Sequence, residues 1–149
     1  MTYLETETAI GSEVVSAVLM HLNGGDIQDA TACFAEKFEF YDRGIGLEFT
    51  DRARLAEFFQ KIRELYSRVS VQTDRSFVSG DYVATEWTLR YTVTEPFYDG
   101  LSRKVPISLH GASVVRIENG KITDWADYYD GLASRRTALA AHFTEWIEL

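Results

Sequence analysis

The sequence predicts an α+β domain in which a strongly curved antiparallel sheet wraps around about three N-terminal helices. Apolar residues recur with a helical period in the first third of the chain, and with a period of two from Ser70 onward. The later strands are joined by short glycine-containing turns that are typical of hairpins. Because three main helices must cover long strands, a curved sheet is the economical arrangement, and it leaves a concave mouth for a small ligand.

The helices follow one another along the chain. An apolar stripe over residues 14–22 predicts a first helix that ends at Asn23-Gly24-Gly25. Asp26 can cap a short second helix that runs to residue 34, and Thr50 or Asp51 can cap a third whose apolar side chains recur over residues 55–66. A helical period returns over residues 132–147 and predicts a C-terminal helix.

The strands alternate apolar and polar residues. A first strand is expected over residues 38–46, where it ends in glycines. Segments 71–79 and 82–94 form a hairpin through Ser79-Gly80-Asp81, and segments 105–117 and 122–129 form another through residues 118–121. In the second turn, Asn-Gly supplies the positive φ angles that a tight hairpin needs.

Length and charge exclude several classes of protein. The chain has 149 residues, which predicts one domain over 1–149, and its 15 basic and 23 acidic residues give a net charge of −8. This charge argues against binding to nucleic acid or to an anionic membrane surface. Cys33 alone forms no internal disulfide, no apolar run is long enough to span a membrane, and the N-terminus lacks the pattern of a signal peptide. We therefore expect a cytoplasmic protein.

No strong catalytic or metal-binding motif is present. The sequence contains no GxGxxG, P-loop, HExxH or GxSxG pattern. His21, His110 and His142 fall on different predicted elements and share no spacing typical of metal ligands. We therefore expect neither a metal nor a cofactor, which leaves carboxylates as the candidate reactive groups.

Asp42 ends an alternating strand that carries Phe38 and Phe40. An acid among aromatic rings at the mouth of a pocket can have a raised pKa. The alternative is an aspartate that accepts hydrogen bonds from its own turn, as such residues often do before glycine, and the residues alone favour this second interpretation.

Asp127 lies on one strand face with Trp125 and Tyr129. An acid between two aromatic residues on a buried face must be hydrogen-bonded or functional, and in a pocket it could transfer a proton near neutral pH. The alternative is that this face is exposed to solvent. Both interpretations remain open from the residues alone.

Trp87 and Leu89 share a strand face, which predicts core residues that also form pocket walls in a cupped sheet. His110 points away from the face that carries Ser113, unless a bulge at Gly111 redirects it. A hydrogen-bonded structural histidine is the favoured interpretation of His110.

The run G-x-x-V-x-R-I-E-N-G-K-I-x-x-W-x-x-Y-Y-D over residues 111–130 resembles the SnoaL-like branch of the nuclear-transport-factor-two-like superfamily. The similarity extends from the LNGGD sequence of residues 22–26 to the end of the chain. It implies a cone-shaped α+β barrel with a mixed sheet and a deep apolar pocket. Members include polyketide cyclases, ketosteroid isomerases and limonene epoxide hydrolases, which apply acid–base chemistry to small hydrophobic molecules without a cofactor, and other members only bind or assemble.

In limonene epoxide hydrolases, the residue matching Asp127 belongs to an Asp–Arg–Asp triad, and Trp87 and Leu89 stand where the resemblance places the other two members. The tyrosine and asparagine beside that triad match Phe40 and Asp42.

In ketosteroid isomerases, the proton-shuttling aspartate matches Asp42, in the pattern that begins Phe34-Ala35. The oxyanion-hole tyrosine of those enzymes matches Val18, and their protonated aspartate falls near Ser113. The two resemblances together imply that Asp42, Asp127 and Trp87 surround one cavity.

We therefore expect an acid–base enzyme, namely a cyclase, an isomerase or a hydratase or hydrolase, that acts on a small hydrophobic substrate. Asp127 is the expected general acid or base, Asp42 its partner, and Tyr129 or His110 a hydrogen-bond donor to a developing oxyanion. The expected substrate-binding residues are Trp87, Leu89, Trp125, Phe40, Val18, Phe58 and Ser113. The alternative is a non-catalytic ligand-binding or assembly module. The resemblance also implies a homodimer through the outer sheet face, which the apolar segment 105–115 would suit.

Overall fold

The computed structural model of the protein describes residues 3–96 and 102–132. The helix predicted over residues 132–147 lies, apart from its first residue, outside these ranges. None of the helices in the described ranges is long and apolar enough to cross a membrane.

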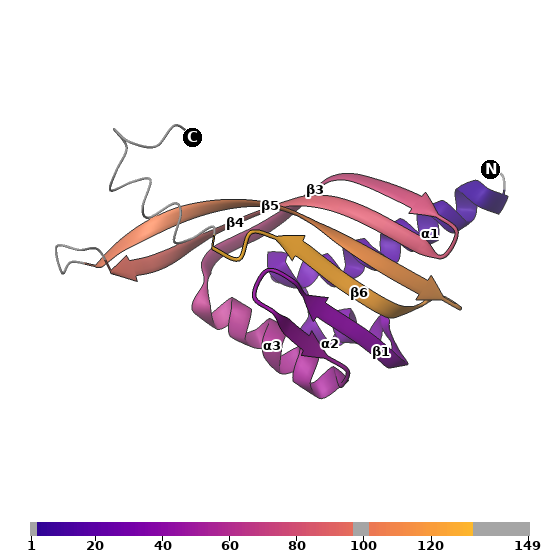
Figure 1. Cartoon of the computed structure of the whole chain (residues 1–149), viewed down its shortest axis with the longest axis horizontal. Helices are drawn as coiled ribbons and strands as arrows, with labels where there is room; N and C mark the ends of the chain where they lie inside the picture. The colour runs from indigo at the N-terminus through magenta and orange to yellow at the C-terminus, as the bar shows by residue number, and fades with distance from the viewer. Residues whose placement is uncertain (1–2, 97–101, 133–149) are drawn as a thin grey trace.

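Four helical segments precede or interrupt the strands of a single sheet, and they lie together against one face of it (Figure 1). The helical segments are α1 (Tyr3–Leu19), the 3-10 helix η1 (Met20–Asn23), α2 (Ile27–Ala32) and α3 (Arg52–Leu65). The strands are β1 (Phe34–Asp42), β2 (Leu47–Phe49), β3 (Ser67–Ser79), β4 (Tyr82–Pro96), β5 (Ser102–Glu118) and β6 (Lys121–Tyr129).

The sheet has six strands in the order β2-β1-β6-β5-β4-β3. All neighbours are antiparallel except β1 and β6, which run parallel. The long strands β3, β4 and β5 curve over α1, as Figure 1 shows. The α+β class and the curved, mixed sheet are thus confirmed.

Two aspartates set the starts of the shorter helices. The Asp26 side chain accepts a hydrogen bond from the Asp29 backbone N–H at 3.1 Å, and Asp51 accepts one from Arg54 at 3.0 Å. Asp51, rather than Thr50, is therefore the cap of α3.

The second helix is shorter than predicted, because the chain joins the sheet earlier. The Cys33 carbonyl accepts a hydrogen bond from the Ile122 N–H at 2.9 Å, and β1 starts at Phe34. The prediction that this helix runs to residue 34 was wrong, and the short strand β2 was not predicted.

Both predicted hairpins form. Asn119 and Gly120 have φ angles of 51° and 76° in the β5–β6 turn, and Gly80 has a φ of 57° in the β3–β4 turn. These positive angles explain the residues found there, since glycine and asparagine adopt them at least cost.

The core lies between the helices and the inner face of the sheet. The largest fully buried side chains come from both layers: Trp125, Phe34, Phe59, Leu55, Ile122, Val15, Val18, Val83 and Val115. This face of the sheet carries the candidate site.

Candidate functional site

A cavity of about 310 Å³ lies between the helical layer and the inner face of the sheet. Most of its lining residues are apolar, and the polar ones are His21, Asp42, Lys61, Tyr66, Tyr91, Asp127, Tyr129 and Asp130. Nine residues expected at the site line it: Asp42, Asp127, Tyr129, Trp87, Leu89, Trp125, Phe40, Val18 and Phe58.

The Asp127 carboxyl group is held by one of its two oxygens. Its Oδ1 accepts hydrogen bonds from Ser113 Oγ at 2.5 Å and from Trp125 Nε1 at 2.6 Å. Among the residues that the structure describes, none donates to Oδ2. The two hydrogen bonds at one oxygen thus fix the orientation of the carboxyl group.

Ser113 supports Asp127 from behind and does not line the cavity. It is fully buried on β5, directly opposite Asp127 in the β5–β6 register. Its Oγ accepts a hydrogen bond from Trp87 Nε1 at 2.9 Å and donates its own hydrogen to Asp127. Ser113 therefore positions the Asp127 carboxyl group. It was expected among the substrate-binding residues, but it lies outside the cavity lining.

Burial raises the pKa of Asp127 from 3.8 to about 7. The hydrogen bonds from Ser113 and Trp125 stabilise the ionised form and limit this rise, whereas the negative charge of Asp42 adds to it. Asp127 is therefore able to hold or release a proton near neutral pH, which a general acid or base requires.

Asp42 is buried but has little capacity left for a ligand. Its Oδ1 accepts hydrogen bonds from the backbone N–H groups of Gly44 and Ile45, both at 3.1 Å. Its Oδ2 accepts one from the Tyr129 hydroxyl at 2.9 Å. Asp42 thus forms the turn expected of an aspartate before glycine, and it also faces the cavity beside Asp127.

The Tyr129 hydroxyl is committed to Asp42. Burial, followed by the hydrogen bond to Asp42, raises the pKa of Tyr129 well above its usual range, so the phenol stays protonated. Because its one hydrogen goes to Asp42, Tyr129 does not donate to a ligand oxygen in this arrangement. The structure therefore places it as a partner of Asp42 instead of the expected oxyanion donor.

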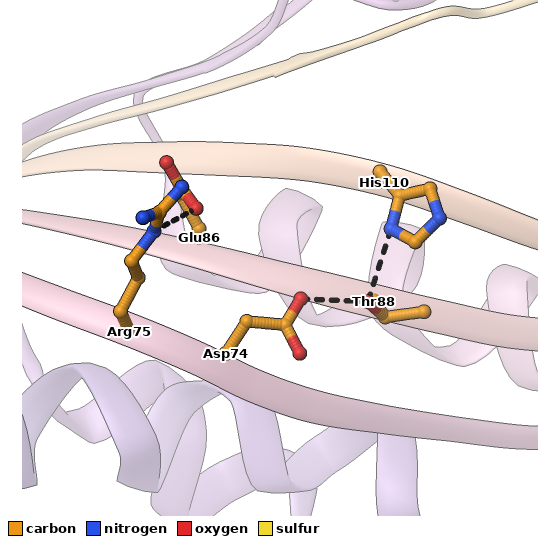
Figure 2. Close-up of polar contacts among 5 residues, drawn as sticks. All are labelled: Asp74, Arg75, Glu86, Thr88 and His110. Atoms are coloured by element: carbon orange, nitrogen blue, oxygen red, sulfur yellow. Dashed lines mark hydrogen bonds and ion pairs between the residues drawn. The ribbon is translucent and has the colours of Figure 1, made fainter.

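His110 lies on the opposite, outer face of the sheet and is exposed (Figure 2). The β4–β5 register continues through Gly111 without a bulge, so the alternation of β5 holds. Thr88 Oγ1 lies 2.6 Å from Asp74 Oδ2 and 3.1 Å from His110 Nδ1. Since the single hydroxyl hydrogen of Thr88 goes to Asp74, His110 Nδ1–H donates to Thr88. This is the structural histidine that the alternation favoured, and it lies outside the site.

Two features of the site were not predicted from the sequence. The first is the direct hydrogen bond from Trp125 to Asp127, for which the signal was present, because the two residues alternate on one strand face. The second is His21, which was considered only as a metal ligand and lines the cavity from the helical side. Within the described ranges, no three His, Cys, Asp or Glu side chains gather as metal ligands.

Comparison with known proteins places this architecture in one family. The model of the SnoaL-like domain matches residues 15–125, so the chain belongs to the SnoaL-like domain family. No match is found among curated proteins.

Solved structures share the fold at low sequence identity. A protein of Catenulispora acidiphila with a ketosteroid isomerase-like fold, solved in complex with trimethylamine, is 19% identical with a TM-score of 0.74, covering 91% of this chain and 98% of its own. An LEH-like epoxide hydrolase of M. tuberculosis is 20% identical with a TM-score of 0.70, covering 93% and 96%. A SnoaL-like polyketide cyclase from Shewanella denitrificans is 14% identical with a TM-score of 0.73, covering 88% and 98%.

Proposed function

We propose that the protein is an acid–base enzyme that transfers a proton to or from a small hydrophobic substrate, with Asp127 as the general acid or base. One observation carries this proposal: Asp127 lines an apolar cavity, has one oxygen fixed by Ser113 and Trp125, and has a pKa of about 7. The names of similar structures, an epoxide hydrolase and a polyketide cyclase among them, support the same class of reaction.

The chemistry follows from the two forms of Asp127. The ionised carboxylate can take a proton from a carbon next to a carbonyl, which leaves a neutral carboxylic acid and an enolate, and the acid can return the proton at the same or another atom. The negative charge of Asp42 raises the pKa of Asp127 and so favours its protonated form. The apolar wall limits competition from water.

The direct test is hydrogen exchange on a simple apolar ketone. We expect the wild-type protein to accelerate exchange of the benzylic α-protons of 2-tetralone in D₂O above the buffer rate, measured by ¹H NMR. Asp127→Asn removes the base and should reduce the enzyme-dependent rate by roughly 100-fold or more. Wild-type rates in the Asp127→Asn variant would contradict the assignment.

Asp124→Asn is the matched control. Asp124 lies three residues earlier on β6. In the strand register it stands opposite Arg116, on the outer face of the sheet. This variant makes the same substitution on the same strand, but Asp124 does not line the cavity. We expect exchange at the wild-type rate.

A binding module is the second candidate, and the residues beside Asp127 favour it. Trp87 and Leu89 are apolar where the resemblance to epoxide hydrolases implies charged groups, and both enlarge the apolar wall. A wild-type protein that binds 2-tetralone without accelerating its exchange would support this candidate over the enzyme.

The outer face of the sheet supports a homodimer. Phe77, Ala84, Val114 and Ala126 form a continuous row of cross-strand neighbours over β3, β4, β5 and β6. Phe77 is 58% exposed and Val114 38%, so the row presents apolar surface to solvent in a single copy.

Light scattering at micromolar concentration tests the dimer. The expected mass is twice 17.0 kDa. Val114→Glu places a charge at the centre of the row and should give a monomer, whereas Ser108→Glu, on the same strand and face but outside the row, should not. A wild-type monomer would refute the dimer.

A further inference from the structure

His21 contributes a further polar side chain to the cavity wall. It lies on η1, lines the cavity from the helical layer, and is only 4% exposed. Its ring stacks on Phe59 with centroids 3.8 Å apart and planes 14° apart. The Arg63 guanidinium donates to the His21 carbonyl from Nε at 2.9 Å and Nη2 at 2.6 Å, which fixes the backbone that carries the ring.

The hydrogen bonds of this ring are incomplete. Nδ1 is fully buried and has no hydrogen-bond partner among the described residues. Because a buried N–H without an acceptor is rarer and costlier than an unpaired acceptor, Nδ1 carries the lone pair and the proton sits on Nε2. Burial, with the nearby charge of Arg63, lowers the pKa of His21 to about 3, so the ring is neutral at physiological pH.

If this position served only the stability of the fold, an apolar ring would be more stabilising there than histidine. Phenylalanine would keep the stacking on Phe59 and remove the unpaired nitrogen, whose desolvation is otherwise not compensated. A buried polar group that costs stability and faces a ligand cavity is typical of a residue retained for binding.

We propose that His21 binds the ligand by donating a hydrogen bond from Nε2–H to a neutral oxygen. The ligand is then an apolar molecule with a carbonyl, ether or hydroxyl oxygen held at the helical wall, while the sheet wall presents Asp127. This inference rests on the proposed function only in taking the cavity as the binding site for an apolar ligand.

The test compares two probes of similar size that differ by one oxygen. 2-Tetralone has a ketone acceptor and tetralin has none, and fluorescence of Trp87 and Trp125 in the cavity wall reports the binding of either. At pH 8, where Asp127 is mostly ionised, the acid does not compete as a donor. We expect His21→Phe to weaken 2-tetralone binding about fivefold to tenfold and to leave tetralin binding within about twofold.

His110→Phe is the matched control, because it makes the same substitution on the outer face. It should leave the affinity for both probes unchanged. Thermal unfolding of His21→Phe supplies the second measurement: we expect equal or higher stability alongside the weaker ketone binding, which a purely structural histidine would not produce.

The outcomes separate this inference from the proposed function. If the wild type binds both probes and His21→Phe changes the two affinities equally, or not at all, the role of His21 is overturned and the cavity proposal stands. If the wild type binds neither probe, both are overturned. If His21→Phe loses affinity for the ketone alone, and the wild type accelerates α-proton exchange, both proposals are supported.

Discussion

The two carboxylates of the cavity differ because of the donors around them. Asp42 accepts three hydrogen bonds, two from its own turn and one from Tyr129. Asp127 accepts two, both at the same oxygen. An acid whose oxygens are all paired contributes charge and structure, whereas an acid with an open oxygen and a pKa near 7 can exchange a proton.

Ser113 is predicted to tune this acid. Ser113→Ala removes a donor that stabilises the ionised carboxylate, so the pKa of Asp127 should rise further, by about one to two units. The measurement is the pH dependence of 2-tetralone exchange, whose rise with pH should shift upward by that amount. Ser108→Ala, on the outer face of the same strand, is the control, and an unshifted Ser113→Ala profile would show that the hydrogen bond does not act on Asp127.

At the scale of the strands, close packing of β5 against β4 sets the position of the Trp87 indole. A Cβ atom at Gly111 would collide with the Trp87 ring, which in turn donates to Ser113. The missing side chain at Gly111 is thus part of the support for Asp127.

Gly111→Ala should therefore impair the site and the fold together. We expect a loss of about 1–3 kcal/mol in the free energy of unfolding, as for other overpacked cores, and a changed pH profile of exchange. Urea unfolding measures the first effect. Ala112→Val adds volume on the outer face of the same strand and should change stability by less than about 0.5 kcal/mol; an equal loss in both variants would refute the collision with Trp87.

The strands and hairpins were predictable from local patterns, but their register was not. A simple continuation of the Asn119-Gly120 hairpin would pair Ser113 with residue 126. A shift between Arg116 and Ile117 moves the pairing by one residue and brings Ser113 opposite Asp127. Such bulges depend on packing across the whole sheet, so the Ser113–Asp127 contact could not be derived from the turn alone.

The residues that line the cavity could be predicted in part, whereas the contacts among them could not. Alternation placed Trp125, Asp127 and Tyr129 on one face, and the structure confirms this. That Tyr129 would bond Asp42 depends on β1 lying parallel to β6, with Asp42 beside Asp127. Parallel pairing between segments so distant in sequence leaves no local signal.

At the scale of the whole molecule, two groups with shifted pKa values give the stability opposite pH dependences. Asp127 has a pKa raised to about 7, so the folded state binds a proton that the unfolded state releases, and stability falls as pH rises from about 4 to 7. His21 has a pKa lowered to about 3, so the unfolded state binds the extra proton, and stability falls as pH drops below about 6.5.

Single variants should separate the two effects. Relative to wild type, Asp127→Asn should gain stability as pH rises from 4 to 7, by up to about 4 kcal/mol, and His21→Phe should gain it as pH falls from 6.5 to 4, by a few kcal/mol. The free energy of unfolding in urea at a series of pH values measures both. Parallel pH curves for wild type and either variant would show that the group in question is not perturbed.

Titration of Asp127 itself shows whether this carboxyl group exchanges a proton at neutral pH. The measurement is the ¹³C chemical shift of the aspartate carboxyl groups of labelled protein between pH 3 and 9, with Asp127 assigned by the signal lost in Asp127→Asn. We predict a midpoint near pH 7. A midpoint near 4, the ordinary value for an exposed aspartate, would show that Asp127 is fully ionised at neutral pH and is not the proton-exchanging group.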